Sequence, residues 1–129
     1  MSECVLDASA VIALMRKEPG HEKVTQCLLG SPAKISAVNL TEVVAKLAHE
    51  GWREDAIRGD VLIEALDDVD FDKDLAFAAG LLRPLTMRAG LSLADRACLA
   101  LAQRLGLPAV TADRSWTTLQ LPITVQCIR

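Results

Sequence analysis

The sequence predicts an α/β fold in which helices cover both faces of a mainly parallel sheet. Short apolar runs of strand length alternate with stretches whose apolar residues recur at helical spacing. Strands that are separated by helices form βαβ units, whose strands run parallel. The chain has 129 residues, 51% of them hydrophobic, and a chain of that length buries roughly two-thirds of its unfolded surface. It can therefore build this core without disulfides or a structural metal.

The first part of the chain predicts two strands and two helices. Residues 4–7 form a short apolar run, and residues 8–17 place apolar side chains at helical spacing before Pro19 and Gly20 end the helix. A second helix is predicted over 21–29, and a second strand over 33–38.

The middle of the chain is mainly helical. A helix is predicted from Asn39 to Gly51 and another over 53–66. A weak strand at Val69 and Phe71 precedes a helix over 73–82.

The last part of the chain predicts a loop, a long helix and two strands. The loop runs from Pro84 to Ser92, and residues 93–106 have the clearest helical pattern. Strands are predicted over 108–111 and 123–128.

No internal repeat, low-complexity segment or linker divides the sequence, so we expect a single domain over residues 1–129. The chain starts without a signal peptide, and no apolar run approaches the roughly 18 residues of a membrane span. The cysteines show no CxxC pair, which favours reduced thiols in the core. We therefore expect a cytoplasmic protein with no membrane partner. The four cysteines are Cys4, Cys27, Cys98 and Cys127.

The charge and the aromatic content disfavour a protein that binds nucleic acid by stacking or by general basicity. There are 17 acidic and 14 basic residues, a net charge of −3, and aromatic residues make up only 3%. An enzyme that holds divalent cations in a carboxylate cluster is an exception, because the loaded site is positive.

Four acidic residues are expected at the edge of the sheet where the strands end. Asp7 ends the first strand, Asp113 follows residues 109–111, and Glu42 and Asp95 lie in the first turns of helices. Ligands bind at the carboxyl ends of strands in such folds. Converging carboxylates without cationic partners repel one another unless a divalent cation neutralises them. The sequence therefore predicts a metal site there.

A structural interpretation of the same acids competes with this one. Asn39 with Glu42, and Ser92 with Asp95, have the spacing of capping boxes, and residues 113–115 are typical of a turn. Capping explains each acid taken singly, and it explains the complete set less well.

The ligand chemistry favours Mg²⁺ or Mn²⁺, because carboxylate oxygens suit hard cations. His21 and His49 lie on predicted helices away from the strand ends, which disfavours zinc. Carboxylate-held cations promote phosphodiester hydrolysis without a side-chain nucleophile. Arg88, Arg96 and Arg114 are expected to help attract the phosphate backbone.

Four segments in order carry a resemblance that spans nearly the whole chain. They are VLDASA at residues 5–10, NLTEV at 39–43, LSLAD at 91–95 and VTADRSW at 110–116. With these segments the sequence resembles the PIN-domain family, and most closely the VapC ribonuclease toxins of type II toxin-antitoxin pairs.

The resemblance implies a three-layer α/β/α sandwich and cleavage of RNA that depends on Mg²⁺ or Mn²⁺. It also implies a homodimer, and a VapB-like antitoxin whose tail covers the site. Carried over by position, Asp7, Glu42, Asp95 and Asp113 would be the catalytic and metal-binding acids, with Asp7 and Asp95 as direct ligands.

Hydroxyl groups complete the site that the resemblance implies. Ser9 matches the family's usual hydroxyl and is expected to hydrogen-bond a water on the metal or Asp113, unless it is a helix N-cap. Thr111 and Ser115 are further candidates.

Two enzymatic alternatives fail at named positions. A receiver-type domain needs a second acid beside Asp7 and a late lysine, but position 8 is Ala and the last lysine is Lys73. A haloacid-dehalogenase-type phosphatase needs an aspartate where Ser9 stands. A non-catalytic PIN-like protein-interaction domain, whose acids serve only as caps, stays open, and metal binding distinguishes it from the nuclease.

Overall fold

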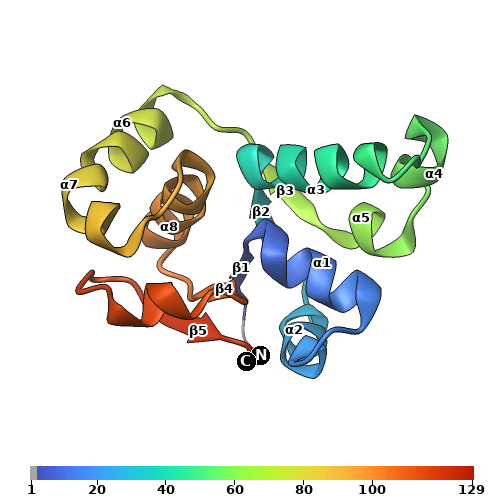
Figure 1. The fold of residues 1–129 in the computed structure, drawn as a ribbon, viewed down its shortest axis with the longest axis horizontal. Coiled ribbons are helices and arrows are strands. Elements are labelled where there is room, and N and C mark those ends of the chain that lie inside the picture. Colours follow the sequence, from blue (N-terminus) through green and yellow to red (C-terminus); the bar gives the residue numbers. More distant parts are fainter. Residues whose placement is uncertain (1–2) are drawn as a thin grey trace.

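The computed structural model describes residues 3–129 and confirms the predicted fold class. A five-stranded parallel sheet has the strand order β3-β2-β1-β4-β5, and helices cover both of its faces (Figure 1). The strands are β1 (Val5–Leu6), β2 (Lys34–Ser36), β3 (Asp67–Val69), β4 (Ala109–Thr111) and β5 (Val125–Cys127). The α-helices are α1 (Ala8–Arg16), α2 (His21–Leu28), α3 (Ala37–His49), α4 (Glu54–Arg58), α5 (Val61–Ala65), α6 (Lys73–Leu81), α7 (Arg83–Thr86) and α8 (Leu93–Leu105). Two 3₁₀ helices are η1 (Met87–Ala89) and η2 (Arg114–Thr118).

The central strand β1 and its neighbour β4 separate two hydrophobic cores. β1 and β4 are buried throughout and pair with Val5 opposite Ala109 and Leu6 opposite Val110. Successive side chains of a strand point to opposite faces. Val5 and Ala109 accordingly pack into one core, while Leu6 and Val110 pack into the other.

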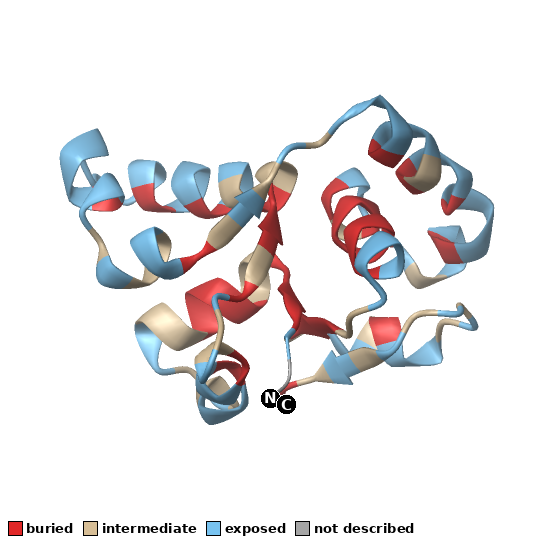
Figure 2. Cartoon of the chain, turned by 180° about the vertical axis from the view of Figure 1, so that it is seen from behind, coloured by how far each residue is buried: buried red, intermediate tan, exposed pale blue. Residues whose placement is uncertain are grey.

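The helices divide between these cores. The core around Leu6 is covered by α1 to α5, and the core around Val5 is covered by α6, α8 and η2, where Trp116 is fully buried. Figure 1 shows the first group on one side of the sheet and α6 to α8 on the other. Figure 2 shows buried residues gathered in the central strands and on the helix faces toward them. The arrangement is the three-layer sandwich that the resemblance implied.

The start of α3 lies two residues earlier than predicted. The expected strand to Val38 ends at Ser36, whose Oγ accepts a hydrogen bond from the backbone N–H of Val38 at 3.2 Å and caps α3. The predicted capping by Asn39 is therefore wrong, because Asn39 lies inside the helix. Serine is a strong N-cap residue, so the helix begins directly after it and the strand ends there.

Two further segments differ from the prediction. The helix expected over 53–66 is broken into α4 and α5, because Asp60 caps a new helix by accepting from the N–H groups of Leu62 and Ile63. The loop expected after Pro84 contains α7 and η1, since proline is well tolerated in the first turn of a helix.

Cys4, Cys27 and Cys98 are buried, as predicted, and Cys127 is half-buried. None of the helices in residues 3–129 has the length and apolar character needed to cross a membrane.

Candidate active site

Asp7 is the most deeply buried of the predicted site residues, with 4% of its surface exposed. It follows β1 and caps α1, because its Oδ1 accepts from the backbone N–H of Ala10 at 2.9 Å. The Ser9 hydroxyl donates to the same oxygen at 2.7 Å, and the Thr111 hydroxyl donates to Oδ2 at 2.5 Å. Three donors therefore fix this carboxylate in one orientation.

The environment of Asp7 disfavours its negative charge. Burial raises the pKa of Asp7 to about 6, and the nearby charge of Asp95 adds to the increase, while the hydrogen bonds from Thr111, Ala10 and Ser9 oppose it. A carboxylate in this position is stabilised by a nearby cation.

Glu42 lies on α3 at the same edge of the sheet. Burial raises its pKa, the hydrogen bond from Asn39 lowers it, and the charge of Asp95 raises it further. The residue itself is exposed.

Asn39 ties α3 to α8, a role that the sequence did not reveal. Its Nδ2 donates to the backbone carbonyl of Ala94 at 3.0 Å and to Glu42 Oε1 at 3.3 Å. The residue is fully buried, and its Oδ1 has no hydrogen-bond partner within residues 3–129. A buried polar atom without a partner is costly, so this oxygen is an acceptor available to a ligand or water.

Asp95 lies in the first turn of α8 and forms the predicted capping box with Ser92. Asp95 Oδ2 accepts from the Ser92 N–H at 2.9 Å, and Ser92 Oγ accepts from the Asp95 N–H at 3.2 Å. Capping and metal binding are compatible, because a carboxylate oxygen has more than one lone pair and a second oxygen stays free.

Asp113 is connected to Asp7 through Thr111 rather than through its own carboxylate. The Asp113 N–H donates to Thr111 Oγ1 at 3.1 Å, while Asp113 Oδ1 accepts from the Ser115 N–H at 2.9 Å and caps η2. Its side chain is exposed.

The structure places Asp95 within electrostatic range of both Asp7 and Glu42. The Cys98 thiol lies near all three acids: burial chiefly raises its pKa, and the charges of Asp7, Asp95 and Glu42 add to the increase. Asp113 does not contribute to any of these shifts.

Across residues 3–129, no lysine, arginine or histidine forms an ion pair with any of the four acids. In the same range, no three His, Cys, Asp or Glu side chains lie close enough to hold one ion together. A cation at this edge of the sheet would therefore have few direct protein ligands, all of them oxygen atoms. Mg²⁺ is such an ion, since it is usually bound by one or two carboxylates and keeps several waters.

Ser9 and Arg96 make contacts other than the predicted ones. Ser9 is neither an N-cap nor bonded to Asp113, because it donates to Asp7 and accepts from the Ala112 N–H at 2.9 Å. Arg96 is buried and donates to the Ala79 carbonyl at 3.2 Å, so it is fixed within the core rather than presented to a phosphate.

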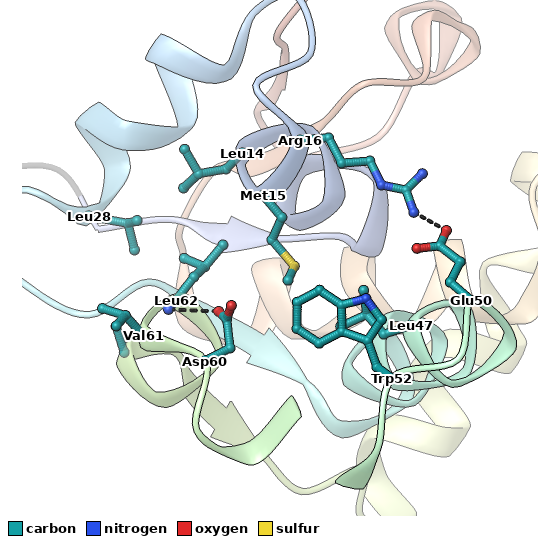
Figure 3. Close-up of a pocket in the computed structure, with 11 residues that line it drawn as sticks. Leu14, Met15, Arg16, Leu28, Leu47, Glu50, Trp52, Asp60, Val61 and Leu62 are labelled. Atoms are coloured by element: carbon teal, nitrogen blue, oxygen red, sulfur yellow. Dashed lines mark hydrogen bonds and ion pairs between the residues drawn. The ribbon is translucent and has the colours of Figure 1, made fainter. Parts of the chain in front are cut away.

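A separate apolar cavity of about 470 Å³ lies away from the acids. Its walls come from α1, α2, α3 and α5, and Figure 3 shows Met15 extending toward the indole of Trp52 inside it. The ion pair between Arg16 and Glu50 lies at its rim. None of the four predicted acids lines this cavity.

Residues 4–120 match the PIN domain family. The chain belongs to the PIN domain family. The matched range includes Asp7, Glu42, Asp95 and Asp113, so all four acids lie within the PIN domain. A comparison with curated proteins finds no significant match.

Solved structures show the same fold. The domain resembles a chain of VapBC2 from Rickettsia felis bound to a promoter DNA fragment, with a TM-score of 0.76 and 17% identity over 98% of this chain and 99% of that one. A toxin-antitoxin complex from Klebsiella pneumoniae has a TM-score of 0.72 and 20% identity over 98% of both chains. VapBC-5 from Mycobacterium tuberculosis has a TM-score of 0.66 and 21% identity over 100% of this PIN domain and 99% of that chain.

Proposed function

We propose that this PIN domain is the ribonuclease toxin of a type II toxin-antitoxin pair and hydrolyses RNA phosphodiester bonds with Mg²⁺, for which Mn²⁺ can substitute. The observation that carries the proposal is the group formed by Asp7, Glu42 and Asp95, in which Asp95 lies within electrostatic range of both other acids and none of the three has a cationic partner in the described residues. Family membership and the fold shared with toxin-antitoxin proteins support it.

The residues of the chain have separate roles in this proposal. Asp7 and Asp95 would bind the cation directly, and Glu42 and Asp113 would complete the acidic site around it. Bound there, the cation would polarise the phosphate and lower the pKa of the attacking water. Ser9 and Thr111 hold the Asp7 carboxylate in place by donating to its two oxygens.

The test is cleavage of total RNA by the purified protein, free of any co-purifying antitoxin. We expect cleavage with Mg²⁺ or Mn²⁺ and none with EDTA, and we expect Asp7→Asn and Asp95→Asn to lose it. Asp68→Asn is the matched control, because Asp68 is exposed on β3 and lies outside the group. Wild-type cleavage by Asp7→Asn would refute the mechanism.

A non-catalytic PIN-like interaction domain is the second candidate function. The observation that favours it is that Asp7 and Asp113 each cap a helix and Asp95 completes the capping box of Ser92, as a purely structural role requires. Calorimetry with Mn²⁺ separates the two candidates. Binding that is weakened in Asp7→Asn supports the nuclease, whereas no binding and no cleavage supports the interaction domain.

We further propose a VapB-like antitoxin as the partner, as in the VapBC complexes that share the fold. The apolar cavity beside Trp52 is the candidate anchor for an apolar antitoxin side chain, because burial of such a side chain is favourable there. Val61 lines this cavity and is 84% exposed. Val61→Glu should weaken inhibition by the antitoxin and leave cleavage by the free toxin unchanged.

A homodimer completes the proposal. Phe77, Leu81, Leu85 and Met87 are each at least 60% exposed on α6, α7 and η1. Large exposed apolar side chains on consecutive helices are typical of an interface.

A further inference from the structure

A polar cavity of about 380 Å³ opens beside the acidic residues, between the start of α1 and the middle of α3. Ser9 and Glu42 form part of its wall, so the cavity is continuous with the candidate active site. Its lining residues are Ala8, Ser9, Ile12, Glu18, Glu42, Lys46 and Arg129.

Lys46 is the available cation of this cavity. It lies one helical turn after Glu42, on the same face of α3, and it is exposed. No acid in residues 3–129 forms an ion pair with it. Glu50, one turn further along, is paired with Arg16 instead.

Arg129, the other cation, is already engaged. Its guanidinium donates to the carbonyl of Pro19 at 3.1 Å and lies 3.4 Å from Glu18 Oε1. Arg129 therefore neutralises Glu18, and these two charges cancel on one side of the cavity.

The charge balance of the cavity then depends on Glu42. Glu42 is the one acid lining the cavity that has no arginine partner in the described residues, and it forms no ion pair with Lys46. In the proposed function Glu42 faces a divalent cation, which leaves the Lys46 ammonium without a balancing charge. A compact ammonium on a flexible stem suits the oxygens of a phosphate.

We propose that Lys46 binds the RNA phosphate adjacent to the one that is cleaved, in this cavity. The inference rests on the proposed function, since it takes the cleaved phosphate to lie at Asp7. Lys46 contacts the same phosphate before and during the reaction, so its contribution is to substrate binding rather than to the chemical step. Lys46 is therefore a substrate-binding residue.

The test measures binding of a labelled single-stranded RNA oligonucleotide to the full chain by fluorescence anisotropy over a range of NaCl concentrations. Ca²⁺ replaces Mg²⁺ as a hard cation for the carboxylates, and a parallel series contains EDTA. We expect Lys46→Gln to raise Kd about 3- to 10-fold and to reduce the slope of log K against log salt by about 0.7, as loss of one phosphate contact requires.

Two variants serve as controls. Lys46→Arg keeps the charge and should retain the wild-type slope. Lys23→Gln removes the same charge from an exposed position on α2 outside the cavity and should leave the slope unchanged. In cleavage assays, Lys46→Gln should raise KM and leave kcat within about twofold.

An unchanged slope in Lys46→Gln would overturn the inference even if RNA cleavage is observed. Absence of RNA binding by the wild type in both series would also overturn it. Weaker antitoxin binding with unchanged RNA binding would assign Lys46 to an acidic segment of the partner instead. A reduced slope without any cleavage would retain the phosphate contact and refute the nuclease.

Discussion

Thr111 donates a hydrogen bond to Asp7 across the two central strands, with 2.5 Å between Thr111 Oγ1 and Asp7 Oδ2. The same hydroxyl oxygen accepts from the Asp113 N–H at 3.1 Å. One buried side chain thus orients the first predicted acid and fixes the backbone of the last.

Thr111→Val should destabilise the fold, because it removes both of these hydrogen bonds while keeping the shape of the side chain. We expect a loss of about 1–3 kcal/mol in the free energy of unfolding, since a buried donor and a carboxylate each lose a partner. Urea unfolding at pH 7 measures the loss. Thr111→Ser keeps the hydroxyl and should retain most of the stability; equal losses in the two variants would contradict the explanation.

The burial of Asp7 predicts a pH dependence of the cation-free protein. The pKa of Asp7 is about 6 in the folded chain, whereas an aspartate in the unfolded chain has its ordinary pKa of 3.8. Between these two pH values the folded state therefore binds more protons than the unfolded state. Stability should therefore fall as pH rises from about 4 to 6, by up to roughly 3 kcal/mol. Unfolding in EDTA across this range measures it.

Asp7→Asn should remove that pH dependence and stabilise the cation-free protein at neutral pH. The amide carries no charge to desolvate, and its oxygen can still accept from Ala10 and Ser9. If Asp7→Asn has the pH profile of the wild type, another group is responsible.

The ion pair between Asp72 and Arg104 should contribute stability that disappears in acid. Arg104 donates to both carboxylate oxygens at 3.0 Å, and chiefly this contact lowers the pKa of Asp72 to about 2. Its contribution is present above about pH 4 and is lost as pH falls toward 2. Asp72→Asn keeps the cap on α6 and loses the charge, so it should be less stable than wild type at pH 7 and equal to it near pH 2. Because the pair is exposed, 1 M NaCl should reduce the difference at pH 7.

Gly20→Ala should destabilise the protein by at least about 2 kcal/mol. Gly20 has a φ of +90°, and a Cβ there would lie 2.2 Å from the carbonyl oxygen of Ile128. Thermal unfolding measures the effect. Gly51→Ala is a matched control, because Gly51 has a similar φ of +96° but open space around it, and it should cost less.

Leu81→Glu should disrupt the proposed homodimer. Leu81 is 74% exposed on α6, so the change costs little in the folded monomer, whereas a charge buried in an apolar interface is unfavourable. Light scattering after size-exclusion chromatography should show a monomer. Leu29→Glu, at an exposed leucine after α2, should remain dimeric; a wild-type monomer would refute the dimer.

Local sequence signals determined much of the fold. The alternation of apolar runs and helical stretches was enough for the parallel sheet, and the capping box of Ser92 and Asp95 located the start of α8. Such signals work because they depend on side chains within a few residues of each other. They failed where two local signals competed, as at Ser36 and Asn39, and where Asp60 began a helix inside an apolar pattern.

The sequence by itself determined the fold class and the four acids that follow strands or begin helices. Only the tertiary structure decided which of them interact: Asp95 acts on both Asp7 and Glu42, and Asp113 is linked to Asp7 through Thr111. It also decided the role of Asn39 and the position of Lys46 beside the site. The physical reason is that electrostatic interaction and hydrogen bonding depend on distances between residues far apart in the chain, which the packing of α1, α3 and α8 sets and no local pattern encodes.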